Sequence, residues 1–367
     1  MANNQPGSDS QGGAHATGTP TLMASEIAEQ PAALEATLAS LLPLRSRIAH
    51  VAAGRKRLLL VARGSSDNAA IYGRYLAELH AGIPASLAAP SVATLYDAHV
   101  DLSDTVAVCV SQSGSTAEIV DTLEWSKRGG AATIAITNVE DSPLARAADL
   151  ALITQAGKEL AVPATKTYTT QVAALAVAVD ALAAAAGRAG TLDAEFVRIG
   201  DQARAMLATP AEVLDAMAGA LAEVDEVLTS GRGLAFGTTL ETALKLEETC
   251  LRPVRGLSYA DLKHGPIAIV DHELLTVLVA GPSGPTVPGL TELAGTVREK
   301  HSMVLGIGGD ASFRSACDLA VPGPDSSEAL APLTLIIPAQ LTVERLAHKL
   351  GLDPDAPRGL RKITQTD

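Results

Sequence analysis

The sequence predicts an α/β protein made of two consecutive units, each with a parallel β-sheet that helices cover on both faces. Three observations support this prediction. Short runs of apolar and β-branched residues alternate with segments whose apolar residues recur at helical spacing. The alternation begins a second time near residue 226, again with a strand followed by a glycine-containing turn. The chain has 367 residues, which is enough for two domains with full cores.

The first unit follows a polar tail. Residues 1–22 are rich in Gly, Ser, Asn and Gln and lack the profile of a signal peptide, so we expect a disordered tail. Residues 23–44 are expected to be helical with a break at Pro31, and a strand at 57–62 leads through the turn RGSSDN into a helix at 69–80. After the segment KELAVPATKTYTTQ comes a long alanine-rich helix. The other strands of this unit are expected near Leu87 and at 105–110, 132–137 and 150–154.

The second unit opens with a strand at 226–230 that ends in the turn Gly231-Arg232-Gly233 and continues into a helix at 239–250. The repeated order suggests an internal duplication at the level of architecture. Ligands of such sheets bind beyond the carboxyl ends of the strands, so the turns of the first unit are expected to meet there. The remaining elements are expected at 274–280, 303–307 and 319–321 as strands and at 333–350 as a helix.

The composition excludes several classes of protein. A net charge of −13, the absence of a Lys/Arg-rich run, and only one Trp, five Tyr and three Phe argue against nucleic-acid binding. The most apolar run, residues 172–187, is interrupted by Asp180, so no membrane span is expected. The cysteines are widely spaced in apolar surroundings, which predicts reduced core thiols of a cytoplasmic protein at Cys109, Cys250 and Cys317.

The turn SQSGST, residues 111–116, joins the apolar strand at 105–110 to a helix. A strand followed by hydroxyl residues, a glycine and a helix gathers free backbone N–H groups, the positive helix end and several hydroxyls at one point. Such a turn either binds an anion, with phosphate the best candidate, or simply caps the helix. Two further segments of this kind, Ser65-Ser66 and residues 162–166, favour a phosphate site if all three face one crevice.

Four titratable residues are candidates for the chemistry. Lys245 and Glu248 lie three residues apart on one face of the helix LETALKLEETC, where they form either a solvated ion pair or a base with its neighbour. His264 precedes a Gly-Pro turn and is either a surface residue or a catalytic one. Lys362, near the chain end, is by default a tail lysine.

Seven ordered motifs resemble those of the tandem sugar-isomerase (SIS) domain family. The resemblance is to the isomerase half of glutamine–fructose-6-phosphate amidotransferase and to the stand-alone glucosamine-6-phosphate deaminases of the same type. It implies two SIS domains, each a flavodoxin-like αβα sandwich, at 23–200 and 201–350, followed by an active-site tail at 351–367. The motifs are MASEIAEQP, RGSSDNA, VSQSGSTAE, ELAVPATKTYTTQ, GRG with LETALKLEE, DLKHGPIA and PRGLRKIT.

The resemblance implies a role for each matching residue. Glu248 matches the base that moves a proton between C1 and C2 of the sugar, and Lys245 matches a lysine kept beside that base. His264 matches a histidine that assists ring opening and is supplied by the neighbouring subunit. Lys362 matches a tail lysine that contacts the open-chain keto sugar or forms an imine with it. The sugar-phosphate cradle is matched by Ser66, Ser111, Gln112, Ser113 and Thr116, and the sugar-lining loop by Val162 and Thr165.

The sequence also departs from the synthase of this family. Ala2 follows Met1, where the synthase has the nucleophilic cysteine of a glutaminase domain, so no glutaminase domain is expected. The ending DAPRGLRKIT resembles the stand-alone deaminases more than the synthase. The other departures, which fall mainly on sugar-side contacts, are Ser115, Ala164, Glu247 and Asp261.

The implied activity is hydrolytic deamination of glucosamine 6-phosphate to fructose 6-phosphate and ammonia, with no metal or organic cofactor. A galactosamine-6-phosphate deaminase and a fructosamine-6-phosphate deglycase are alternatives of the same type. A non-catalytic sugar-phosphate sensor is a further alternative, but the chain has no basic helix-turn-helix pattern, and a sensor has no need for Glu248, His264 and Lys362 together. The expected partners are an amino sugar phosphate and a second copy of the chain, in a homodimer with shared active sites.

Overall fold

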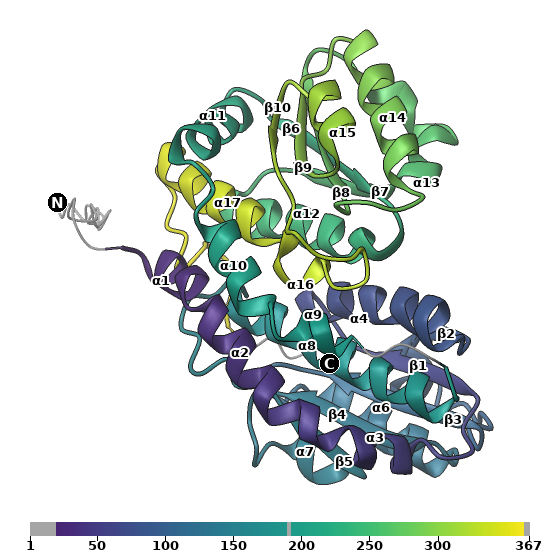
Figure 1. Ribbon diagram of the computed structural model, residues 1–367. Coiled ribbons are helices and arrows are strands. Elements are labelled where there is room, and N and C mark those ends of the chain that lie inside the picture. The colour runs from purple at the N-terminus through teal and green to yellow at the C-terminus, as the bar shows by residue number, and fades with distance from the viewer. Residues whose placement is uncertain (1–19, 189–191, 363–367) are drawn as a thin grey trace, which may run out of the picture.

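The computed structural model describes residues 20–188 and 192–362. They form two lobes, each built around a five-stranded parallel sheet (Figure 1). The predicted α/β class and parallel sheets are therefore confirmed. Most of the expected disordered tail lies outside the described residues, as do residues 363–367 of the expected C-terminal tail, whereas Leu22 already begins the first helix.

The first sheet has the strand order β2-β1-β3-β4-β5. β1 pairs with both β2 and β3, so the winding of the chain reverses between β1 and β3, and a ligand crevice is expected at this point. Val61 lies opposite Cys109, which brings the carboxyl ends of β1 and β3 level with each other. The strands are β1 Arg57–Val61, β2 Ala85–Leu87, β3 Thr105–Val110, β4 Ala132–Thr137 and β5 Leu150–Ile153.

The second sheet has the order β10-β9-β8-β6-β7. Read from β7, this is second, first, third, fourth and fifth strand of the lobe, as in the first sheet. β7 is the strand that the sequence pattern did not predict. It is a half-exposed edge strand and contains Gly256, whose added Cβ would lie 2.7 Å from Leu240 Cδ2. The strands are β6 Glu226–Gly231, β7 Val254–Ser258, β8 Leu274–Ala280, β9 Val304–Gly308 and β10 Leu319–Val321.

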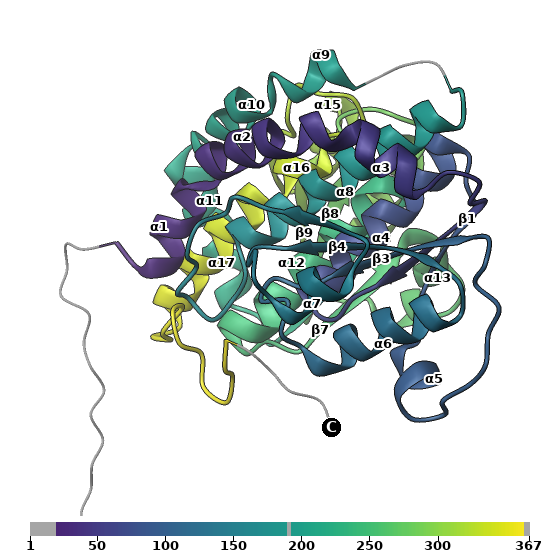
Figure 2. The same cartoon turned by 90° about the horizontal axis from the view of Figure 1, so that it is seen from below.

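Helices cover both faces of the first sheet. α6 and α7 pack on one face, and α4 and α8 pack on the other, with α2 and α3 against α8 (Figure 2). The helices of this lobe are α1 Leu22–Ala28, α2 Gln30–Leu41, α3 Arg45–Val51, α4 Ser65–Leu76, α5 Pro90–Thr94, α6 Ala117–Arg128, α7 Pro143–Ala147 and α8 Lys166–Ala185, with a 3-10 turn at Leu42–Leu44 and a π-helical turn at Ala77–Ala81.

The second sheet is covered in the same way. α14 and α15 pack on its outer face, and α12 packs on the face that looks toward the first lobe, with α17 beside it (Figure 1). The helices are α9 Asp193–Phe196, α10 Ile199–Leu207, α11 Ala211–Ala222, α12 Phe236–Cys250, α13 Tyr259–Lys263, α14 Val287–Glu299, α15 Ala311–Ala316, α16 Pro332–Leu335 and α17 Ile337–Lys349, with 3-10 turns at Gly233–Ala235 and Pro266–Ile269.

One apolar core runs through both lobes. Buried residues from α2, α4 and α8 of the first lobe belong to the same cluster as buried residues from α12 and α17 of the second. α4 and α12 pack directly against each other across the junction. The division expected at residue 200 falls at the start of α10, which contacts helices on both sides of it, and it stays a prediction.

Helix α8 has the length and hydropathy of a membrane span. Of its most apolar window, 89% is buried inside the protein, where it packs against α2, α3 and α4. We therefore interpret α8 as a core helix of this fold. The three cysteines are buried and free, as predicted.

Two helices begin earlier than the sequence predicted. α4 starts at Ser65, because Gly64 adopts a left-handed φ of 57° and ends the turn after β1 at once. α12 starts at Phe236, directly after a 3-10 turn. The break near Pro31 falls at Glu29, because proline is well tolerated in the first turn of a helix and lies there in α2.

Candidate active site

A cavity of about 340 Å³ lies at the carboxyl ends of β1 and β3, where the winding of the first sheet reverses. Its walls come from the turns after these two strands, the loop before α8, the end of α12 and the last described residues of the chain. Eight of the predicted site residues line it, namely Ser66, Ser111, Gln112, Ser113, Thr116, Val162, Glu248 and Lys362.

Two helices begin at this cavity. α4 starts at Ser65 and α6 starts after Thr116, and both are 12 residues long. Their first turns carry backbone N–H groups without intrahelical partners and the positive ends of the helix dipoles. Because Ser66, Ser113 and Thr116 line the cavity beside these turns, hydroxyl donors and N–H donors surround the same space. This arrangement suits an anion.

The turn SQSGST is held in shape by its own hydroxyls. Ser111 Oγ lies 3.5 Å from Thr116 Oγ1 and accepts a hydrogen bond of 3.3 Å from the backbone N–H of Gly114. Gly114 has a φ of 60°, and an added Cβ would lie 2.2 Å from Ser142 Oγ. Ser115 donates to Ser113 Oγ at 2.9 Å. Glycine is therefore required at position 114, and the turn keeps its hydroxyls close together.

Glu248 reaches the cavity from the other lobe and forms an ion pair with Lys245. The Glu248 side chain is 27% exposed and the Lys245 side chain is fully buried, so the carboxylate faces the cavity and the lysine lies behind it. Lys245 Nζ also lies 3.3 Å from Ser65 Oγ and 3.4 Å from Glu241 Oε1. Burial opposes the charge of Lys245, but the carboxylates of Glu241 and Glu248 outweigh it and raise its pKa.

A hydrogen bond of 2.9 Å from Asn68 Nδ2 to Glu241 Oε2 joins α4 to α12 beneath this group. Through Asn68 and Ser65, helix α4 therefore contacts Glu241 and Lys245. The start of α4, which lines the cavity, and Glu248 are held in one polar network.

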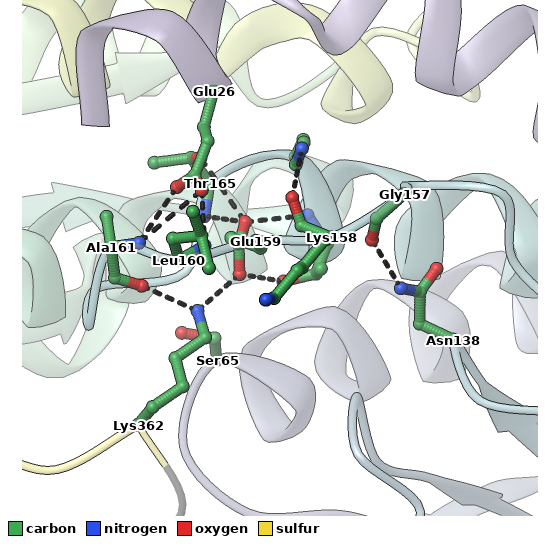
Figure 3. Close-up of polar contacts among 12 residues, drawn as sticks. Glu26, Ser65, Asn138, Gly157, Lys158, Glu159, Leu160, Ala161, Thr165 and Lys362 are labelled. Atoms are coloured by element: carbon green, nitrogen blue, oxygen red, sulfur yellow. Dashed lines mark hydrogen bonds and ion pairs between the residues drawn. The ribbon is translucent and has the colours of Figure 1, made fainter. Parts of the chain in front are cut away.

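Lys362 closes the cavity from the C-terminal segment. Its Nζ donates to Glu159 Oε2 and to the carbonyl oxygen of Ala161, both at 2.7 Å (Figure 3). Glu159 is buried and also accepts hydrogen bonds from the backbone and hydroxyl of Thr167, at 3.1 and 2.6 Å. Burial favours the neutral acid, but the Lys362 ammonium and these hydrogen bonds outweigh it and lower the pKa of Glu159.

The loop before α8 is held in place by α1. Glu26 accepts hydrogen bonds from the backbone N–H groups of Leu160 and Ala161 (Figure 3). The N–H of Val162 donates to the carbonyl oxygen of Asp355 at 2.8 Å. The loop that carries Val162 is thus fixed to both ends of the described chain.

Three predicted site residues do not line the cavity. Lys245 lies behind Glu248, as described above. Thr165 is buried and donates its N–H and hydroxyl to Glu159, and Thr167 lines the cavity in its place. His264 follows α13 and is exposed to solvent. Within this chain His264 therefore lies apart from the other predicted residues.

The anion-type segment 162–166 needs a similar correction. Lys166 is 1% exposed, and its Nζ bonds to Glu29 and to the carbonyl oxygen of Lys158 at 2.7 Å. Lys166 does not line the cavity, because its ammonium group is paired with Glu29, between α1 and α2, and bonded to the loop before α8. Only Val162 and Ala164 of this segment face the cavity.

Sequence reasoning missed Glu159, Glu241 and Arg63. Glu159 and Glu241 are buried carboxylates at the two lysines of the site, and Arg63 lines the cavity. Glu159 and Glu241 each lie in a segment of mostly apolar or small residues. Because a glutamate is rarely buried without a partner, this pattern could have predicted a buried ion pair at each of them. No group of three or more His, Cys, Asp or Glu side chains in residues 20–188 and 192–362 is arranged to hold a metal ion.

The comparisons with known proteins agree with this geometry. The family model described as SIS domain matches residues 53–181, which contain β1 to β5. A solved structure of a candidate phosphosugar isomerase from Silicibacter pomeroyi DSS-3 is 31% identical, with a TM-score of 0.81, over 92% of this chain and 100% of that one. This chain belongs to the SIS domain family.

Other SIS relatives match nearly the whole chain. The glutamine–fructose-6-phosphate aminotransferase (isomerizing) of Thermococcus kodakarensis is 31% identical over 355 residues, which are 95% of this chain and 58% of the relative. This SIS chain therefore spans somewhat more than half the length of the curated relatives that it matches. The C-terminal domain of glucosamine-fructose-6-phosphate aminotransferase from Francisella tularensis is 28% identical, with a TM-score of 0.84, over 94% of this chain and 100% of that one.

Proposed function

We propose that this protein converts glucosamine 6-phosphate and water into fructose 6-phosphate and ammonia. The reaction combines an aldose–ketose isomerisation with hydrolysis of the resulting imine. The observation that carries the proposal is that Glu248 lines the same cavity as the hydroxyl-rich turns at the starts of α4 and α6. A base and an anion site on opposite walls suit a small molecule with a phosphate at one end and an acidic C–H bond at the other.

The phosphate is proposed to bind between the turns after β1 and β3. Backbone N–H groups and hydroxyls are strong donors to phosphate oxygens, and two helix ends add positive potential. Ser66, Ser111 and Thr116 are the hydroxyl residues that supply these donors. Fixing the phosphate in this way sets the position of the sugar carbons relative to Glu248.

Glu248 is proposed to act as the base on the open-chain sugar. Its carboxylate takes the proton from C2 of the amino aldehyde, and the C1 carbonyl oxygen gains a proton, which gives an enolamine. The acid returns a proton to C1 while the amino group loses one, which gives a ketose imine. Water adds at C2 and ammonia leaves, so that fructose 6-phosphate remains. General acid–base catalysis of this kind contributes about 10²–10⁴-fold to the rate.

The two lysines are proposed to support this proton transfer differently. Lys245, paired with Glu248 and fully buried, fixes the direction of the carboxylate. Lys362 Nζ lies at the cavity wall, bonded to Glu159, where it can contact the oxygen at C1 or C2. Leu360 and Arg361 of the same C-terminal segment also line the cavity.

Ring opening is assigned to His264 of the partner subunit in a homodimer. The exposed position of His264 at the end of α13, apart from the cavity of its own chain, supports this assignment. We propose that the protein uses water to deaminate glucosamine 6-phosphate, and does not use ammonia from glutamine to make it. The support for this direction is the segment DAPRGLRKIT, which resembles the stand-alone deaminases.

The test is ammonia release from 2-amino-2-deoxy-glucose, 2-amino-2-deoxy-galactose and fructosamine 6-phosphates, with enzymatic detection of fructose 6-phosphate. The proposal predicts the highest kcat/KM with glucosamine 6-phosphate and equal amounts of the two products. Preference for the galacto epimer or for the fructosamine ester would replace the substrate assignment and keep the site. Binding of all three without ammonia would show a sensor and overturn the enzymatic assignment.

A further inference from the structure

We propose that Arg63 is a further substrate-binding residue, whose guanidinium bridges Glu118 and the phosphate group of the bound sugar. This inference rests on the proposed function, because it takes the turns after β1 and β3 to hold that phosphate. The inference adds a guanidinium to a phosphate site whose other proposed donors are hydroxyls and backbone N–H groups.

Arg63 lies in the turn between β1 and α4 and lines the cavity together with Gly64 and Ser66. Its Nε and Nη2 donate to the two carboxylate oxygens of Glu118, both at 2.8 Å. Glu118 lies in the first turn of α6, two residues after Thr116. The ion pair therefore links the two helices whose N-terminal ends flank the proposed phosphate position.

The pair with Glu118 leaves one edge of the guanidinium unused. A guanidinium carries five N–H donors, and Glu118 takes the one on Nε and one on Nη2. The Nη1 donors and the second Nη2 donor have no acceptor among residues 20–188 and 192–362. The Nη1–Nη2 edge has the geometry for two parallel hydrogen bonds to phosphate oxygens.

The exposure of the two side chains fits the roles of ligand contact and support. Arg63 is 50% exposed and is therefore accessible from the cavity, whereas Glu118 is only 13% exposed. A carboxylate fixed in α6 orients the guanidinium and neutralises it while the site is empty. An arginine held in this way loses less conformational entropy when the phosphate binds than a free surface arginine does.

The charge balance of the site also calls for a cation at this position. The protein carries a net charge of −13, and the carboxyl of Asp67 lies in the first turn of α4. Two helix ends together supply only about one positive charge. The other cations that line the cavity, Arg361 and Lys362, belong to the C-terminal segment and not to the turns after β1 and β3.

The test is calorimetric titration of the full chain with inorganic phosphate at fixed ionic strength, using Arg63→Gln and Arg63→Lys. Arg57→Gln is the matched control, since Arg57 forms a similar exposed pair with Asp104 at the opposite end of β1. We expect Arg63→Gln to weaken phosphate binding about tenfold, because the hydrogen bonds from a charged, half-exposed donor are lost. Arg63→Lys keeps the positive charge but lacks the paired N–H donors of the guanidinium, so its phosphate affinity should lie between those of Arg63→Gln and the wild type.

Phosphate affinity of Arg63→Gln within twofold of the wild type, as for Arg57→Gln, would overturn the proposal. Full recovery by Arg63→Lys would overturn the bridging geometry. Thermal unfolding of Arg63→Gln at the wild-type temperature shows that any loss is local. Because phosphate binding is measured without turnover, a wild-type protein that binds phosphate but releases no ammonia contradicts the proposed function alone. KM for glucosamine 6-phosphate should rise in Arg63→Gln with little change in kcat.

Discussion

At the scale of single residues, the site depends on two ion pairs that each contain one buried side chain, Glu159 with Lys362 and Lys245 with Glu248. Glu159 and Lys362 are separated by 203 positions, and Lys245 joins α12 to α4 through Ser65. Removing one member of a buried pair leaves the other charge uncompensated, which costs more than the pair itself contributes. Each lysine therefore affects both the shape of the cavity and the stability of the fold.

Replacing Lys362 by Met should destabilise the protein in a pH-dependent way. We expect a loss of about 2 kcal/mol in the free energy of unfolding at pH 7, because Glu159 stays buried without its cation. Lys362 lowers the folded-state pKa of Glu159, so the contribution is present above the ordinary glutamate pKa of 4.5 and is lost as the pH falls through the folded value. Urea unfolding of both proteins between pH 3 and pH 8 measures this difference.

The matched control is Lys263→Met, which removes an exposed ion pair of 2.9 Å to Glu292. This change should alter the free energy of unfolding by less than about 0.5 kcal/mol at every pH. A loss in Lys362→Met that stayed constant down to pH 3 would contradict the link to Glu159.

The site residues that sequence alone could predict are those in motifs where strand, turn and helix follow each other. Ser66, Ser111 and Thr116 lie at the cavity because a parallel sheet brings such turns to one edge. Glu159 could not be predicted, because its partner comes from the other end of the chain. Thr165 was expected to line the sugar, but its donors are used to hold Glu159.

At the scale of elements, the packing of α4 against α12 positions Glu248 relative to the start of α4. Gly237 allows this close approach, since an added Cβ would lie 2.4 Å from the backbone oxygen of Asn68. The hydrogen bond from Asn68 to Glu241 lies in the same contact. A backbone atom cannot move aside as a flexible side chain can. A larger residue than glycine at position 237 would therefore push α4 and α12 apart.

Replacing Gly237 by Ala should separate α4 from α12 and destabilise the protein by about 1–3 kcal/mol. Gly219→Ala is the control, because Gly219 lies in α11 with nothing within 4 Å of an added Cβ. That variant should gain about 0.5–1 kcal/mol, since alanine is a better helix former than glycine. Chemical denaturation of both variants measures the effect, and equal stability of the two would show that the contact has no role.

The strands were predicted well where both faces are buried and poorly at an edge. The bounds of β3, β4 and β8 agree with the apolar runs in the sequence, because every residue of these strands is buried. β7, with Arg255 and Gly256 in its centre, has no apolar alternation and was missed. The early start of α4 was also missed. The positive φ of Gly64 sets this start, and the spacing of apolar residues does not report a backbone angle.

At the scale of the whole molecule, the proposed function requires a second copy of the chain to complete the site. His264 lies outside the cavity of its own chain, while Glu248 lies inside it. A homodimer that exchanges His264 between subunits needs one residue from each chain in every site. The proposed function therefore makes a prediction about mixed dimers.

Glu248→Gln and His264→Ala should each be inactive alone and should complement each other when refolded or expressed together. Random pairing places one intact site in about half of the dimers, so about a quarter of wild-type activity is expected. Ammonia release from the mixture, compared with each parent at the same concentration, measures this. A mixture as inactive as its parents would mean that no site combines His264 and Glu248 from different chains.

The most direct test of the central claim compares Glu248→Gln with Glu247→Gln. Glu247 is the neighbouring carboxylate on α12, is exposed and does not line the cavity. Glu248→Gln should reduce kcat for ammonia release from glucosamine 6-phosphate by about 10³-fold while fructose 6-phosphate still binds, because only the proton transfer is lost. Glu247→Gln should keep wild-type kcat. Undiminished turnover in Glu248→Gln would contradict the assignment of the base.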